Sequence, residues 1–105
     1  MTKKGVSIVI PSFNNKKTLF RLLDSVFESK FKKLEVIVVD NSTTNKILVG
    51  GKKRYPKVKW IDAGRENLGQ TTVYNLGFAS AKQVNHILYC DEDVVLDPLM
   101  ITYLV

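Results

Sequence analysis

The sequence predicts an α/β fold, a Rossmann-like parallel sheet with helices on both faces. Two features predict this class: short apolar runs rich in β-branched residues recur along the chain, and stretches with helical apolar spacing lie between them. Strands that alternate with helices in this way form parallel sheets covered on both faces. With 105 residues, the chain is expected to form a single domain.

The four expected strands are apolar runs that end in polar or turn-forming residues. The first ends at Pro11, and the second ends at Asp40-Asn41-Ser42. The third ends at Asp62, and the fourth opens at His86 and leads into Asp91-Glu92-Asp93. The first three runs are Val6–Ile10, Leu34–Val39 and Val58–Ile61. Because the carboxyl ends of parallel strands meet at one edge, these polar residues are expected to gather where a ligand binds.

The first expected helix follows Asn14 and Asn15, and either side chain is expected to cap it by accepting from free first-turn amides. Its apolar face repeats at helical spacing, whereas Phe13 and Phe20 are read as packing residues rather than recognition residues. The residues on that face are Leu19, Leu22, Leu23, Val26 and Phe27.

Thr43 or Thr44 is expected to cap the second helix, and the pair Gly50-Gly51 is expected to end it. The third helix is expected to run to about Ala81, with Val73, Leu76 and Gly77 on its inner face. Asp97-Pro98 is a typical start for a further helix.

Composition indicates a soluble globular chain, with 45% hydrophobic and 25% charged residues. The apolar runs are too short for a signal peptide or a membrane span. The lone Cys90 is expected to be a buried thiol in a reducing compartment. These features predict a cytoplasmic location.

Charge is divided along the chain. Residues 1–60 hold fourteen Lys or Arg against four acids, and residues 61–105 hold two against six. The densest basic cluster, residues 52–59, is read first as a solvated loop, second as a contact with an anionic membrane surface, and last as a nucleic-acid site. We therefore expect no nucleic-acid partner and leave a peripheral membrane contact open.

The segment Asp91-Glu92-Asp93 is a candidate metal site. Alternate side chains of an extended backbone share a face, so Asp91 and Asp93 are expected to point the same way. Two carboxylates can hold Mg²⁺ or Mn²⁺ together with substrate phosphates. Clustered surface acids are usually only solvated, so the remaining motifs decide between the two readings.

Several chemistries are excluded by missing motifs. A glycine-rich dinucleotide loop or a phosphate-cradling P-loop is absent after the first expected strand. With one histidine and one cysteine, neither a Ser-His-Asp triad nor a zinc site is credible. A nucleotide site remains, with Asp40 at the base or ribose and Asp91 with Asp93 at a metal-bound diphosphate.

Four segments together resemble glycosyltransferase family 2 in its GT-A fold, in the order and spacing of that family. They are Val6 to Asn14, Leu34 to Thr43, Glu66 to Gly69 with Asn75 to Phe78, and Ile87 to Asp93. The chain departs from many members at Asn41, where the form resembles a rhamnosyltransferase-type branch, and at Tyr74, where many relatives have Arg.

The resemblance implies a nucleotide-sugar-binding domain over residues 1–105 and a UDP-, dTDP- or GDP-linked donor. It implies that Pro11 and Ser12 line the nucleotide pocket, that Asp40 contacts the base, and that Asp91 to Asp93 is a D-x-D segment for Mg²⁺ or Mn²⁺. The nucleotide-binding set carried over from the motifs is Pro11, Ser12, Asn14, Asp40, Asn41, Asn67 and Asp91.

The implied activity is inverting, metal-dependent transfer of a sugar to an acceptor sugar or a lipid-linked glycan. Family members continue well beyond the segment matched here, and their general base and acceptor site lie in that continuation. We therefore expect a C-terminally truncated donor-binding half, inactive alone and with apolar surface that favours self-association. The alternative is a non-catalytic nucleotide-binding or assembly module.

Overall fold

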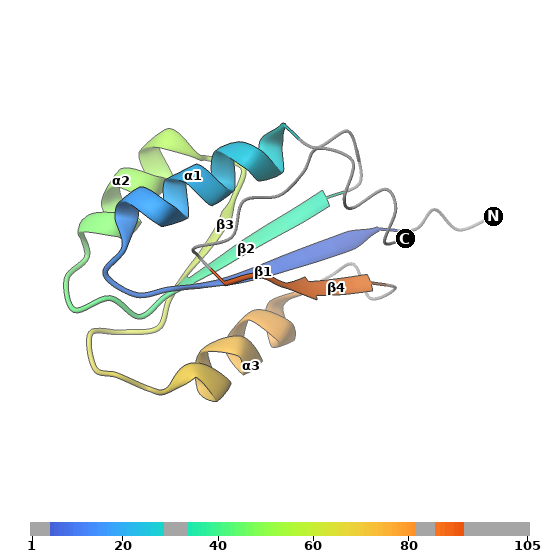
Figure 1. The fold of residues 1–105 in the computed structure, drawn as a ribbon. Coiled ribbons are helices and arrows are strands. Elements are labelled where there is room, and N and C mark those ends of the chain that lie inside the picture. The colour runs from blue at the N-terminus through green and yellow to red at the C-terminus, as the bar shows by residue number, and fades with distance from the viewer. Residues whose placement is uncertain (1–4, 29–33, 82–85, 92–105) are drawn as a thin grey trace.

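The computed structural model describes residues 5–28, 34–81 and 86–91. Strands and helices alternate along the described chain (Figure 1), as the sequence predicts. The strands are β1 (Val6–Ser12), β2 (Leu34–Asp40), β3 (Lys59–Asp62) and β4 (His86–Tyr89). The helices are α1 (Lys16–Phe27), α2 (Lys46–Arg54) and α3 (Gln70–Ser80).

The sheet has the strand order β3-β2-β1-β4, and all neighbouring strands are parallel. Ser12 at the end of β1 pairs with Asp40 at the end of β2, and Asp40 pairs with Asp62 at the end of β3. The polar ends of these strands therefore lie level with one another, at the carboxyl edge of the sheet.

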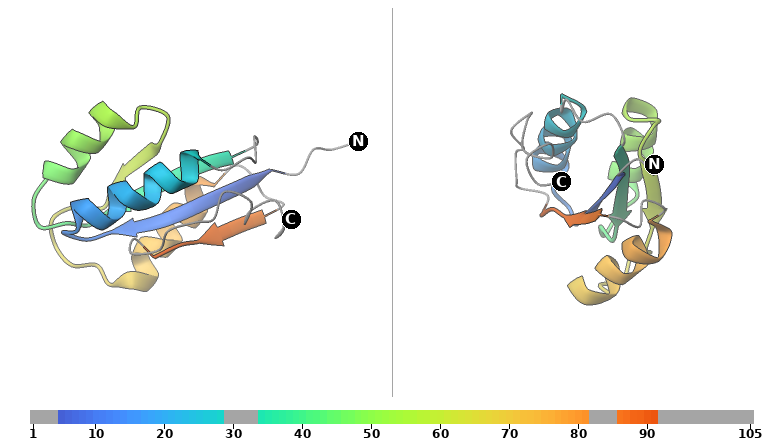
Figure 2. Two further views of the ribbon diagram at one scale, coloured as in Figure 1. Left: turned by 45° about the horizontal axis from the view of Figure 1, so that its top comes forward. Right: turned by 90° about the vertical axis from the view of Figure 1, so that its right-hand side faces the viewer.

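Helices α1 and α2 cover one face of the sheet and α3 covers the other (Figures 1 and 2). Ile8 and Ile10 of β1 pack with the α1 side, whereas Val9 packs with Val73 of α3. Both faces of β1 are thus buried, which explains its continuous apolar run. The predicted α/β class, with helices on both faces, is confirmed.

Strand β1 continues through Pro11 to Ser12, so the predicted strand end at Pro11 is wrong. Pro11 pairs with Val39 of β2, but its ring nitrogen points to the β4 side, where the amide of Cys90 donates to the carbonyl of Val9 at 3.0 Å. Since proline has no N–H, Pro11 cannot continue the ladder with β4. The paired residues of the two strands end at Val9 and Tyr89.

Neither Asn14 nor Asn15 caps α1 through its side chain, so that expectation is wrong. Asn15 is the N-cap residue but makes no side-chain cap hydrogen bond, and the carboxamide oxygen of Asn14 accepts from Thr43 instead. Phe20 is buried as expected, whereas Phe27 is 46% exposed and stacks on the ring of Tyr55. At the carboxyl end of α1, the buried face therefore includes Val26 but not Phe27.

Helix α2 runs through both glycines, so the prediction that they end it is wrong. Gly51 is buried, and a Cβ atom built there would overlap the ring of Trp60 on β3. Glycine is thus required by close packing against Trp60, not by a helix end. The predicted cap is also absent: Asn45 is the N-cap residue, and Thr44 Oγ1 accepts only a long 3.4 Å hydrogen bond from the Lys46 amide.

The basic cluster is solvated as expected, although part of it is helical. Lys52, Lys53 and Arg54 form the last turn of α2 and are exposed. Cations are favourable there because the carboxyl end of a helix carries partial negative charge.

The third helix begins after Gly69 and ends at Ser80, close to the predicted position. Val73 and Gly77 are buried against the sheet, and a Cβ atom at Gly77 would overlap Val9. Leu76 is 37% exposed, so its predicted place on the inner face is wrong. The predicted helix at Asp97-Pro98 lies outside the described residues.

Cys90 is buried, and burial raises the pKa of its thiol to about 11. The expectation that Cys90 is buried is thereby confirmed. Among the helices that the structure describes, none is both long and apolar enough to cross a bilayer.

Candidate functional site

A cavity of about 430 Å³ opens at the carboxyl edge of the sheet. Its lining includes residues at the ends of β1, β2 and β4 and residues at the start of α3. Of the residues predicted from the sequence, five reach it from four separate segments: Pro11, Ser12, Asn41, Asn67 and Asp91. The convergence expected from the strand ends is therefore present.

The cavity lies beyond the paired residues of β1 and β4. Beyond the last ladder bond at Cys90, Pro11 on one side and Asp91 on the other both line the cavity. Pro11 thus offers no N–H toward β4 at the place where the polar residues gather.

Ser12 carries a buried polar atom with no partner among the described residues. Its residue is 1% exposed, and its Oγ makes no hydrogen bond within that part of the chain. An unsatisfied buried hydroxyl costs on the order of 1–3 kcal/mol. Other atoms of Ser12 line the cavity.

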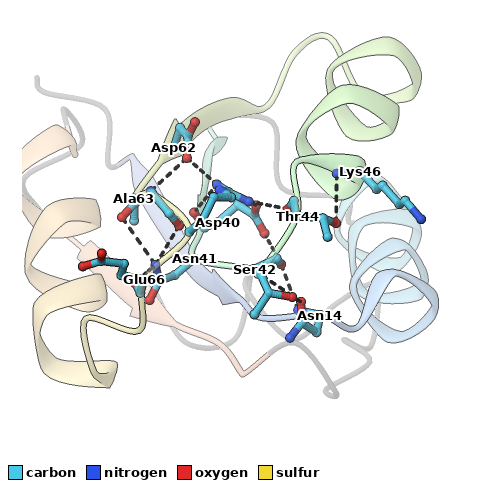
Figure 3. A network of polar contacts seen from close by, with 12 residues as sticks. Asn14, Asp40, Asn41, Ser42, Thr44, Lys46, Asp62, Ala63 and Glu66 are labelled. Atoms are coloured by element: carbon cyan, nitrogen blue, oxygen red, sulfur yellow. Dashed lines mark hydrogen bonds and ion pairs between the residues drawn. The ribbon is translucent and has the colours of Figure 1, made fainter.

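Asp40 is fully buried and does not line the cavity. Its carboxylate accepts from Ser42 Oγ at 2.6 Å and forms an ion pair with Arg65 at 3.2 Å (Figure 3). The guanidinium of Arg65 also donates to Asp62 and to the carbonyl of Thr44. The structure thus places Asp40 as the centre of a charged network that joins the ends of β2 and β3.

The opposite charges of Arg65 and Asp62 stabilise each other's charged form. Burial acts to lower the pKa of Arg65, but its bonds to Asp62 and Asp40 outweigh burial and raise that pKa. The pKa of Asp62 is lowered, first by the backbone N–H of Gly64 and then by Arg65. Asp62 and Arg65 therefore remain charged near neutral pH.

Asn41 lines the cavity, but its carboxamide is engaged within the protein. Its Nδ2 donates to the carbonyls of Gly64 at 2.9 Å and Glu66 at 2.7 Å, with a longer bond to Ala63 (Figure 3). Its Oδ1 accepts from the amide of Leu68 at 2.9 Å. Asn41 therefore holds the loop between β3 and α3 in place. It lines the cavity, but both polar atoms of its side chain are already hydrogen-bonded within the protein.

Asn14 lies outside the cavity lining and ties β1 to the segment after β2. Its backbone takes a positive φ of 57°, which asparagine tolerates better than most residues. Its amide donates to Ser42 Oγ at 2.8 Å, and its Oδ1 accepts from the amide of Thr43 at 3.0 Å. In this structure the contacts of Asn14 are therefore structural, and its nucleotide-binding role stays a prediction.

Asn67 lies at the cavity on the loop that Asn41 holds. Its Oδ1 accepts from the amide of Gly69 at 2.9 Å. Gly69 has a φ of 83°, a conformation that glycine adopts without strain. The carboxamide nitrogen of Asn67 has no partner among the described residues.

Asp91 is exposed at the end of β4 and lines the cavity. Its Oδ1 accepts a 2.9 Å hydrogen bond from the hydroxyl of Tyr74, while no described residue donates to Oδ2. A carboxylate oxygen of this kind fits Mg²⁺ or Mn²⁺. Asp93 lies outside the described residues, and no three acidic, histidine or cysteine side chains gather within them.

Several residues of the site were not predicted from the sequence. Phe13, read as packing, is 46% exposed and lines the cavity with Gln70. Asn15, Gly69 and Val73 complete the lining. Their positions directly after β1 and at the start of α3 were the available signal, because both segments meet the carboxyl edge.

The comparisons with known proteins agree with this geometry. An uncharacterized glycosyltransferase of Haemophilus influenzae is 27% identical over 88 residues, which are 84% of this chain and 29% of the relative. Residues 1–349 of S. aureus TarS superpose with a TM-score of 0.77 at 24% identity, over 95% of this chain and 31% of that one. TarS has also been solved in complex with UDP-GlcNAc.

The mannosyltransferase PcManGT from Pyrobaculum calidifontis, in complex with GDP-Man and Mn²⁺, gives a TM-score of 0.79 at 20% identity. That match covers 96% of this chain and 31% of PcManGT. The chain thus spans less than a third of the length of these relatives. The fold is that of the GT-A glycosyltransferases.

A family model described as glycosyl transferase family 2 matches residues 7–105. This match includes every strand end that contributes to the cavity. The chain therefore belongs to glycosyl transferase family 2.

Proposed function

We propose that this chain is the donor-binding part of a glycosyltransferase that moves a sugar from a nucleotide diphosphate to an acceptor hydroxyl. The observation that carries the proposal is the convergence of Pro11, Ser12, Asn67 and Asp91 on one cavity. These residues come from segments that are distant in sequence and meet where parallel α/β sheets bind their ligands.

The ligands of the structural relatives support a nucleotide sugar. PcManGT was solved with GDP-Man and Mn²⁺, and TarS was solved with UDP-GlcNAc. Both relatives share the fold over almost the whole of this chain. We infer a nucleotide-sugar donor of the same chemical class, with a sugar or a lipid-linked glycan as the acceptor.

The described residues divide the work of donor binding. The buried hydroxyl of Ser12 can hydrogen-bond a donor group that enters the cavity, and the carboxamide nitrogen of Asn67 can donate to a polar donor atom. Phe13 offers an exposed aromatic face beside them. These groups supply shape and hydrogen bonds without a fixed charge.

Asp91, with Asp93, would hold Mg²⁺ or Mn²⁺ at the cavity. Bound against a diphosphate, such an ion neutralises charge that grows on the leaving group. The chain contributes the carboxylate of Asp91, whose Oδ1 accepts from Tyr74. Transfer with inversion requires a general base that is not among the described residues of the cavity.

Titration calorimetry with UDP, dTDP and GDP, each with and without Mn²⁺, tests the proposal. We expect binding of one nucleotide in the low-millimolar to micromolar range, tightened by Mn²⁺ at least tenfold. Asp91→Asn should abolish the Mn²⁺ effect, whereas Glu28→Gln, the same charge change at the exposed end of α1, should leave it intact. Absence of binding by every nucleotide under both conditions would overturn the proposal in favour of an assembly module.

A further inference from the structure

Tyr74 connects α3 to Asp91. Its hydroxyl donates to Asp91 Oδ1 at 2.9 Å across 17 residues of sequence. Tyr74 does not line the cavity, yet it contacts Asp91 and Gln70, which both do. Its influence on a ligand must therefore pass through these neighbours.

The ring of Tyr74 is held from two sides. It packs against the buried cluster of Val9, Ile37 and Val73 between the sheet and α3. On its other side it makes an edge-to-face contact with Tyr89 of β4, with ring centroids 4.7 Å apart and an interplanar angle of 84°. Such aromatic pairs stabilise one orientation of both rings. The packing of the ring therefore holds the Tyr74 hydroxyl toward Asp91.

The contacts around the Tyr74 hydroxyl set the direction in which it donates. The weak 3.5 Å contact from Gln70 Nε2 approaches the Tyr74 oxygen as a donor. Tyr74 is therefore the donor and Asp91 Oδ1 the acceptor, which leaves Oδ2 of Asp91 for another partner.

We propose that Tyr74 is a positioning residue. Its hydrogen bond fixes the carboxylate of Asp91 so that Oδ2 of Asp91 can bind the metal ion that accompanies the nucleotide-sugar donor. This inference rests on the proposed function. A neutral phenol on α3 thus orients a carboxylate that follows β4. Hydrogen-bond partners of this kind typically change metal affinity by about 10- to 100-fold when removed.

The test is Tyr74→Phe, which removes the hydroxyl and preserves the ring packing. Tyr89→Phe is the matched control, since it removes the hydroxyl of the other ring in the same pair, which has no hydrogen bond among the described residues. Nucleotide affinity is measured by calorimetry in Mn²⁺ and in chelator, together with the thermal unfolding midpoint of each variant.

We expect Tyr74→Phe to weaken nucleotide binding in Mn²⁺ by about tenfold while the affinity in chelator stays within about twofold. A residue that only supported the fold would weaken both affinities together, so the ratio of the two separates positioning from stability. Tyr89→Phe should leave both affinities unchanged. In an Asp91→Asn background, Tyr74→Phe should have no further effect, because the partner that it positions is gone.

Equal effects of Tyr74→Phe on both affinities, or an additive effect in the Asp91→Asn background, would overturn the inference. So would an unchanged affinity in Mn²⁺. In each case a wild-type protein that binds nucleotide leaves the proposed function standing. A wild-type protein that binds no nucleotide overturns the proposed function, and the inference falls with it.

Discussion

The two adjacent glycines of α2 provide a sharp test of the packing between α2 and β3. Gly50 lies in the same helix as Gly51, but a Cβ atom at Gly50 would have Lys16 Nζ, at 3.9 Å, as its nearest neighbour. A Cβ atom at Gly51 would overlap two ring atoms of Trp60 and lie 2.8 Å from a third, Cζ3. The indole cannot swing away freely, because its N–H donates to the carbonyl of Tyr55 at 3.1 Å.

The magnitudes follow from helix propensity and from overlap. Alanine in place of glycine inside a helix is worth about 0.5–1 kcal/mol. Gly50→Ala should therefore stabilise the protein by that amount. Gly51→Ala gains the same propensity, but overpacking of a well-filled site costs about 1–3 kcal/mol, and the direct overlap favours the upper end. The propensity contribution is common to both variants, so their difference isolates the overlap at about 2–3 kcal/mol.

Urea unfolding followed by fluorescence measures this difference, and Trp60 is the single tryptophan of the chain. With a slope near 2 kcal/mol per molar urea, the two midpoints should differ by about 1–1.5 M, with Gly50→Ala above the wild type and Gly51→Ala below it. Equal midpoints would refute the contact between Gly51 and Trp60. A fall for both variants would instead restore the helix end that the glycine pair suggested.

Three further predictions concern the network at the carboxyl edge. Asn41→Ala removes the carboxamide that pins the loop after β3 and should destabilise the protein by about 2–3 kcal/mol in urea unfolding, whereas Asn45→Ala, which loses no side-chain cap bond, should change it by less than about 0.5 kcal/mol. Arg65→Met leaves the buried carboxylate of Asp40 without its cation and should cost about 3 kcal/mol in the same assay; a change below about 1 kcal/mol would contradict a buried charge at Asp40. The pKa of Asp62 is lowered in the fold, so its contribution is present above the ordinary pKa of about 3.9 and is lost as pH falls through the folded value; Asp62→Asn should flatten the loss of stability on acidification below about pH 4, as followed by thermal unfolding.

The strands, and the covering of the sheet by helices on both faces, could be predicted from the sequence. A strand that is buried on both faces has a continuous apolar run, which can be recognised locally. The run from Val6 to Ile10 is apolar throughout, and both faces of β1 are indeed covered. The end of α2 could not be predicted in this way. Gly51 is explained by Trp60, which lies in another element, and no local pattern distinguishes a glycine required by packing from one that ends a helix.

The roles of the asparagines were hidden for the same reason. Asn14 and Asn15 form a typical capping sequence, yet Asn14 bonds Thr43, which lies 29 residues away. The carboxamide of Asn41 forms hydrogen bonds with a loop 23 to 27 residues away. Propensity rules describe local alternatives for such side chains, and tertiary contacts decided against those alternatives here.

The distribution of unused polar atoms separates the residues that build the site from those that can bind in it. The carboxylate of Asp40, the carboxamide of Asn41 and the carboxamide oxygen of Asn14 are engaged by partners within the chain. Within the described chain, the hydroxyl of Ser12 lacks a partner, as does Oδ2 of Asp91. Substitution of the first group should therefore lower the free energy of unfolding and affect affinity only through the fold. Substitution of Ser12 or Asp91 should do the opposite: affinity should fall while stability is retained, or even improved at Ser12, because an alanine there removes an unsatisfied buried hydroxyl.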